Sequence, residues 1–198
     1  MSAENLTTIP WACHSEPVGN AIKDHLFSLK DSRYDPLVGV ALCALRNILS
    51  KNGKLSASTA VIALTDSGCR SHVKRVTDGI IESRPRQAFF ARGGANMLAS
   101  YASIALESHG PCFSMSGGAD ALRFALDVSL QMIRSNTCEQ ILLIAADYEQ
   151  TDMHAMVLLL DGSNQEYLEK LRVQNDSGTA NPSSILRNLM KFNIDTVK

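Results

Sequence analysis

Near its middle the chain reads Gly110-Pro-Cys-Phe-Ser-Met-Ser-Gly-Gly-Ala-Asp-Ala-Leu-Arg-Phe-Ala-Leu126, and this stretch decides the fold. Residues 112–116 are compact and apolar enough for a buried strand, and Gly117 and Gly118 permit a tight turn into a helix with an apolar stripe. In many enzymes such a turn presents a reactive side chain at a helix N-terminus, where N–H groups and the helix dipole stabilise an anion. The apex residue here is Ala119, which has no nucleophilic atom. The pattern therefore predicts a nucleophile elbow without a nucleophile.

Around the elbow, the spacing of apolar residues predicts alternating helices and strands. The run 58–65 is almost continuously apolar and β-branched, which is typical of a central strand covered on both faces. A short polar link joins the last two apolar strands and allows them to pair antiparallel. Helices are predicted at 17–29, 37–49, 71–82, 96–106, from the turn to about 136, and in the tail at 164–173 and 183–192; strands are predicted at 58–65, 112–116, 140–146 and 154–160. This order predicts an α/β domain whose mixed sheet has helices on both faces.

Length and composition indicate one domain whose partner is a neutral molecule or a protein. The 198 residues suffice for one substantial core, which we place at about 33–161, with a lead-in at 1–16 and a helical tail at 162–198. The net charge of −1 is scattered, which excludes nucleic acid and anionic membrane surfaces as expected partners. The five cysteines show no metal or redox spacing, so we expect reduced structural thiols and no metal site. No secretory signal or long apolar run is visible, which predicts a soluble cytoplasmic protein.

From about 33 to 161 the chain resembles the N-terminal half of a thiolase-fold β-ketoacyl synthase. The family motif reads Gly-Pro, a short apolar strand, Thr-Ala-Cys-Ser/Thr-Ser and a helix containing Ala-Leu, and the spacing from Gly110 to Leu126 fits it without a gap. Upstream, Phe89-Phe90 is followed by Asn96-Met97 in a helix, as in the family. The resemblance implies a single ketosynthase-like N-terminal domain over 1–198, a thiolase-like half-fold with a mixed sheet of the five-stranded type.

The departures from the family motif bear on activity. Aligned in this way, the family's Thr-Ala-Cys-Ser falls on Gly117, Gly118, Ala119 and Asp120, so the cysteine that forms the acyl thioester is absent. The chain also stops before the second half-domain, which supplies the family's two histidines, and the connection 147–154 is short. The chain therefore resembles a chain-length factor, most closely the shortened kind found in aryl-polyene type II polyketide synthases. The resemblance implies a non-catalytic subunit in polyketide, aryl-polyene or fatty-acid-type biosynthesis.

The same resemblance implies partners and a site. The partner would be a full-length β-ketoacyl synthase, with the substrate carried on the phosphopantetheine of an acyl carrier protein and no cofactor, nucleic acid or membrane of the chain's own. In the family the elbow strand lies at the dimer interface, and the region of Phe89 lies beside the partner's acyl pocket; a plain core role is the alternative for Phe89, Phe90 and Met97. The tunnel and interface residues are Phe89, Phe90, Ala95, Met97, Tyr101, Pro111, Cys112, Phe113, Ser114, Met115 and Ser116.

Two other functions remain open at the level of sequence. An enzyme such as a malonyl-thioester decarboxylase would use Ser114, Ser116 or Asp120, with a histidine as base; the candidates are His72, His109 and His154. A homodimeric scaffold that binds carrier protein would pair the elbow strand with its own copy. Arg84 and Arg86 would suit an acidic carrier protein or a phosphate, although two arginines near a proline usually belong to a solvated loop.

Overall fold

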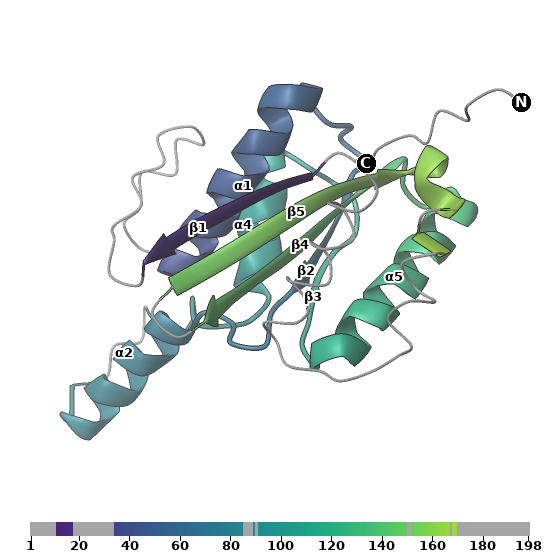
Figure 1. The fold of residues 1–198 in the computed structure, drawn as a ribbon. Helices are drawn as coiled ribbons and strands as arrows, with labels where there is room; N and C mark the ends of the chain where they lie inside the picture. The colour runs from purple at the N-terminus through teal and green to yellow at the C-terminus, as the bar shows by residue number, and fades with distance from the viewer. Residues whose placement is uncertain are drawn as a thin grey trace, which may run out of the picture.

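A five-stranded mixed sheet forms the centre of the chain, in the strand order β1-β5-β4-β2-β3 (Figure 1). The computed structural model describes residues 11–17, 34–84, 89, 91–149, 152–166 and 168–169. Central strand β2 (Ala60–Leu64) is parallel to β3 (Cys112–Met115) and to β4 (Gln140–Glu149). Strand β5 (Asp152–Asp161) returns antiparallel to β4, as the short link predicted.

Helices cover both faces of the sheet, which confirms the predicted α/β architecture. Helices α1 (Pro36–Asn52) and α4 (Met97–Leu106) share one hydrophobic core with the sheet, and α5 (Gly118–Arg134) shares the other. Successive side chains of β2 point to opposite faces of the sheet. Val61 and Ala63 face α1 and α4, whereas Ile62 and Leu64 face α5. All four side chains are buried, which explains the continuous apolar run in the sequence.

Strand β1 (Trp11–Pro17) corrects the sequence prediction at the N-terminal side. It pairs antiparallel with β5, with Trp11 opposite Leu158, so residues 11–16 are an edge strand rather than a lead-in, and Pro17 ends a strand rather than starting a helix. The remaining part of the predicted helix 17–29 lies outside the described residues. Strand β1 is short, and its backbone hydrogen bonds go to a strand far along the chain. Its own sequence therefore shows little alternation of apolar and polar residues from which a strand could be predicted.

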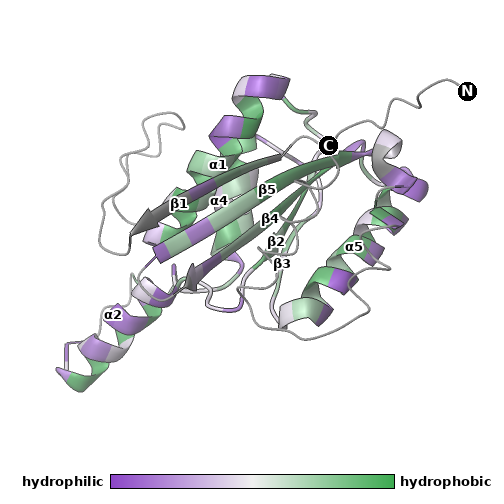
Figure 2. Ribbon diagram, in the orientation of Figure 1, coloured by the Kyte–Doolittle hydropathy of each residue, from purple (hydrophilic) through white to green (hydrophobic). Residues whose placement is uncertain are grey.

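Helix α2 (Arg70–Ile81) runs away from the body of the sheet (Figure 1) and alternates apolar and polar side chains along its length (Figure 2). Val73, Ile80 and Ile81 are exposed, whereas His72 and Gly79 are buried. Of the predicted tail helix at 164–173, residues 165–166 and 168–169 are helical and follow the short 3-10 turn η1 (Gly162–Asn164), and Leu168 is buried in the α5 core. Residues 170–173 lie outside the described residues. The predicted helix at 183–192 lies outside the described residues.

Candidate functional site

The strand-turn-helix predicted from the sequence is present and forms the candidate site. Gly117 and Gly118 have φ values of +136° and +59°, and α5 begins at Gly118. Positive φ values favour glycine, most strongly at the +136° of Gly117, and the chain turns from β3 into α5 at these two residues. The predicted apex, Ala119, lies one residue beyond this point, inside the first turn of α5. None of these three residues carries a nucleophilic atom.

A carboxylate from the neighbouring strand lies against the turn. Asp66, two residues after β2, accepts hydrogen bonds from the backbone N–H of Gly117 at 2.8 Å and from that of Gly118 at 3.0 Å through Oδ1. Its Oδ2 accepts from the same Gly118 N–H at 3.1 Å, and its Oδ1 accepts from the Ser116 hydroxyl at 3.3 Å. The N-terminal end of α5, the usual place for an anion in such a turn, is therefore occupied by a side chain of the protein itself.

Sequence reasoning missed Asp66, although a signal was present. An acidic residue follows the buried strand 58–65, and the carboxyl ends of parallel strands meet at one edge of a sheet. Because β2 and β3 are parallel neighbours, the residues after β2 reach the turn that follows β3. A polar residue directly after each buried parallel strand is the sequence pattern that would have indicated Asp66.

A second carboxylate, that of Asp147 in β4, holds the loop that carries Asp66. Its buried Oδ1 accepts hydrogen bonds from the N–H of Asp66 at 3.0 Å, from the N–H and hydroxyl of Ser67 at 2.8 and 2.6 Å, and from the Thr65 hydroxyl at 3.3 Å. Burial raises the pKa of Asp147, the hydrogen bonds from Ser67 and Asp66 oppose the rise, and the negative charge of Asp66 adds to it. Asp147 thus fixes the backbone from which Asp66 reaches the turn.

A third carboxylate, Asp35, caps α1 and ties it to α2. It accepts from the N–H of Leu37 at 3.0 Å, from the N–H of His72 at 2.9 Å and from the Tyr148 hydroxyl. Burial and the neighbouring Asp35 charge raise the pKa of Tyr148, and the same two causes raise the pKa of the Cys69 thiol to about 12. Both groups therefore keep their protons at neutral pH.

The predicted histidine bases are not brought to the predicted serines or to Asp120. His72 is buried, with Nδ1 3.2 Å from the Arg92 carbonyl oxygen. His109 lies at the amino end of β3, where its N–H bonds the Ala57 carbonyl, whereas Ser116 lies at the carboxyl end. His154 is opposite Asp147 on β5, and two strands separate it from β3. The Asp120 side chain is 89% exposed, 3.5 Å from Arg123.

The predicted tunnel residues near Phe89 lie in different surroundings. Met97 and Tyr101 pack against the α1 and α4 core, and the Tyr101 ring meets Tyr34 edge-on at 6.0 Å. Phe89 contacts His72 edge-on at 5.1 Å, and the Arg75 guanidinium lies 5.1 Å over its ring. Ala95 is exposed beside Gly68. Phe90 and Arg86 lie outside the described residues, and Arg84 is exposed after α2.

Among the described residues, strand β3 pairs with β2 alone, so its other side is open at the edge of the sheet. The carbonyls of Pro111 and Met115 bond the N–H groups of Val61 and Thr65 at 2.8 and 3.1 Å, so the peptide groups of Cys112 and Ser114 point away from β2. Phe113 and Met115 pack against the α5 core, while Pro111 and Cys112 are exposed. The buried Ser114 hydroxyl has no hydrogen-bond partner among the described residues.

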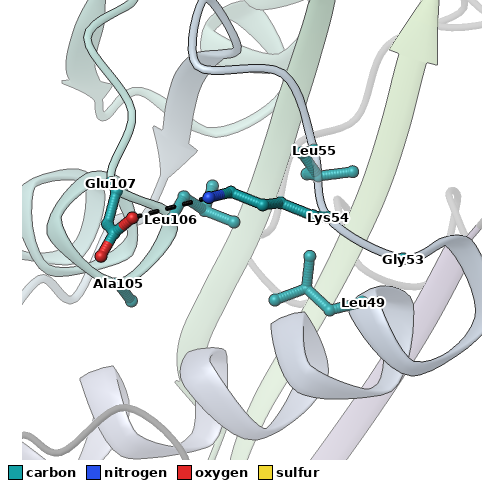
Figure 3. A pocket seen from close by; sticks show the side chains of 7 residues that line it. All are labelled: Leu49, Gly53, Lys54, Leu55, Ala105, Leu106 and Glu107. Carbon is teal, nitrogen blue, oxygen red and sulfur yellow. Dashed lines mark ion pairs between the residues drawn. The ribbon is translucent and has the colours of Figure 1, made fainter.

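A pocket of about 380 Å³ lies at the other end of the sheet, near the amino end of β2 (Figure 3). Leu49 and Leu55 line its apolar side, and Lys54 Nζ reaches Glu107 Oε2 at 3.7 Å across it. Both ionic side chains are largely exposed, so the ion pair stabilises little. Among the described residues no cluster of metal ligands occurs, and no helix there is long and apolar enough to cross a bilayer.

Comparisons with known proteins define the fold. No protein-family model matches the chain, and no curated protein matches it. Among solved structures, the ishigamide ketosynthase/chain length factor is similar over 73% of this chain and 48% of that one, with a TM-score of 0.62 and 17% identity. A chain from the complex of the ketosynthase ApeO with its chain length factor ApeC, from Xenorhabdus doucetiae, covers 78% of this chain and 79% of its own length, with a TM-score of 0.59 and 15% identity.

A β-ketoacyl synthase from Burkholderia phymatum STM815 is similar over 76% of this chain and 48% of its own, with a TM-score of 0.59 and 13% identity. The chain therefore has the α/β fold of the thiolase-like ketosynthases and their chain length factors, as its elbow motif predicted. It spans about half the length of the ishigamide protein and of the Burkholderia synthase.

Proposed function

We propose that the chain is a non-catalytic, chain-length-factor-like subunit that pairs with an active β-ketoacyl synthase and shapes its acyl tunnel. The main support is the elbow, which has no nucleophile and lies beside the open edge of strand β3. Gly118 and Ala119 offer no thiol for an acyl thioester, and Asp66 fills the space before the turn. A subunit of this kind contributes surface rather than chemistry to the complex.

The open edge of β3 supports the pairing. The outward peptide groups of Cys112 and Ser114 are suited to an antiparallel strand from a partner, which would continue the sheet through both subunits. The buried Ser114 hydroxyl would gain a cross-strand partner in such a pair. Exposed Ile104, on the neighbouring helix α4, would add apolar area to the same interface.

In this proposal the residues around Phe89 contribute to the partner's acyl tunnel. Phe89, Phe90, Ala95, Met97 and Tyr101 would set its length, with the small Ala95 leaving room for an extended chain. The substrate would arrive on the phosphopantetheine of an acyl carrier protein, and the chain would need no cofactor. The pathway class we propose is polyketide, aryl-polyene or fatty-acid-type biosynthesis, because solved structures of similar fold include a ketosynthase with its chain length factor.

The pairing is tested with a substitution that acts only on the open side of β3. Ser114→Pro removes an N–H that points away from β2, so it blocks a partner strand and leaves the β2 ladder in place. Ser114→Ala is the matched control, because it keeps the N–H. Co-expressed with a β-ketoacyl synthase from the same gene cluster, the wild type and Ser114→Ala should co-purify with it and Ser114→Pro should not. A chain that forms a dimer by itself and never co-purifies would instead support the homodimeric scaffold and refute the subunit.

A further inference from the structure

We propose that Asp66 is an internal ligand of the elbow, whose carboxylate excludes carboxylates and thioester oxyanions from the N-terminal end of α5. This role of Asp66 depends only on its contacts at the turn, whether or not the chain pairs with a synthase. It makes Asp66 a residue that determines what this position can bind. The contacts of Asp66, the support of its loop and the charge at the turn all favour this role.

Asp66 uses the donors that an anion would need. Its two carboxylate oxygens accept from the N–H groups of Gly117 and Gly118 at 2.8 to 3.1 Å and from the Ser116 hydroxyl at 3.3 Å. Two adjacent N–H groups with a hydroxyl beside them form the donor set of an oxyanion hole. While Asp66 holds these donors, a substrate oxygen has none of them available.

The contact is long-range, unlike an ordinary helix cap. Asp66 lies 51 residues before Gly117 along the chain, and the residue in the local cap position, Gly117, has no side chain to do the same. The loop of Asp66 is fixed by the buried Asp147, which accepts the N–H groups of Asp66 and Ser67. The carboxylate is therefore positioned before any ligand arrives and loses little conformational entropy in staying there.

The negative charge of Asp66 also keeps other anions away from the N-terminal end of α5. A second carboxylate at hydrogen-bond distance from the same N–H groups would be repelled by Asp66. A thiol placed at position 118 or 119 would likewise ionise less readily, because the negative charge of Asp66 offsets the positive end of the α5 dipole. Removal of Asp66 should therefore both open an anion site and lower the pKa of an introduced thiol.

Acetate titration followed by amide NMR tests the first consequence in the full chain. In Asp66→Ala the amide signals of Gly117 and Gly118 should shift and saturate as acetate is added, whereas the wild type should show no saturation. Asp120→Ala is the matched control, because it removes a negative charge from the same first turn while the Asp66 contacts remain. Saturable shifts of equal size in the wild type, or none in a folded Asp66→Ala, would refute the proposal.

If Asp66→Ala does not fold, a cysteine introduced at the turn provides a second test. Asp66→Asn removes the charge and keeps one side-chain oxygen as an acceptor near the turn, with an NH2 group in place of the second oxygen. In the background of Ala119→Cys, the rate of alkylation by iodoacetamide against pH, resolved by site with mass spectrometry, gives the pKa of the new thiol. This pKa should be at least one unit lower when Asp66→Asn is added than when Asp66 is retained, and equal values would overturn the proposal.

Discussion

A Cβ atom on Gly110 would lie 2.4 Å from the backbone oxygen of Thr59, so the start of β3 is pressed against the start of β2. The Ser58 backbone oxygen would lie only 2.7 Å from the same atom. The Ser108 hydroxyl and the His109 N–H bond the same segment, to the carbonyls of Thr59 and Ala57. The glycine of the Gly-Pro motif is thus required by the close approach of two backbones.

Gly110→Ala should lower the free energy of unfolding by about 2 kcal/mol or more, because neither backbone can move away without losing the β2 to β3 ladder. Urea unfolding followed by circular dichroism measures the change. Gly162→Ala is the control, since a Cβ atom there would have nothing within 4 Å, and it should change the free energy of unfolding by less than about 0.5 kcal/mol. Equal stability of the two variants would show that the contact relaxes freely.

Asp147 should make stability depend on pH. Burial raises its pKa in the folded chain above the ordinary value of 3.8, so the folded chain binds this proton more tightly than the unfolded chain. The stabilising contribution is complete below that ordinary value and is lost as pH rises through the folded pKa. Asp147→Asn should therefore flatten the fall in unfolding free energy above pH 3.8, as measured by urea titrations at a series of pH values. Asp120→Asn, at an exposed site, should keep the wild-type profile.

Loss of the Asp147 acceptor altogether should be costly at any pH. Asp147→Ala leaves the N–H groups of Asp66 and Ser67 without their acceptor, which corresponds to about 2–4 kcal/mol of unfolding free energy. The same variant should release Asp66 from the turn, visible as a change in the amide signals of Gly117 and Gly118. A variant with wild-type stability and unchanged amide signals would contradict the supporting role of Asp147.

Two exposed cysteines give an internal test of the proposed interface. Cys112 lies on β3 and Cys13 on β1, at opposite edges of the sheet. In the isolated chain iodoacetamide should modify both, and the buried Cys69 should react far more slowly because its pKa is raised to about 12. In a complex with the synthase Cys112 should become protected by at least tenfold while Cys13 reacts as before. Equal reactivity of Cys112 with and without the synthase would place the interface elsewhere.

The proposed tunnel makes a prediction about products. Ala95→Phe should shorten the acyl chains made by the reconstituted pair, because a ring would fill the space that Ala95 leaves open. Ala57→Phe places the same ring at an exposed position near the amino end of β2 and should leave product length unchanged. Mass spectrometry of the released products measures the difference. Unchanged length in Ala95→Phe would remove this region from the tunnel.

Most helices and strands were predicted from the sequence, and the clearest are those whose apolar pattern is long. Strands β2, β4 and β5 and helices α1 and α5 are buried over most of their length, so periodicity alone indicates them. Strand β1 was missed because its partner β5 lies far along the chain. The position of Asp66 was missed for the same reason, since its role depends on the parallel pairing of β2 and β3 rather than on its neighbours in sequence. The histidines looked available in the sequence, but only the folded structure shows that none of them reaches the elbow. Two strands separate His154 from β3, His109 lies at the opposite end of β3, and His72 is buried on α2.

Asp66 also bears on how readily a catalytic turn could arise from this chain. A cysteine gained at position 118 or 119 alone would meet a carboxylate at the turn and would remain a poor nucleophile. A carboxylate lost at position 66 alone would leave an empty turn with no thiol. A reactive thiolate at this turn would therefore need two changes together, in segments about fifty residues apart.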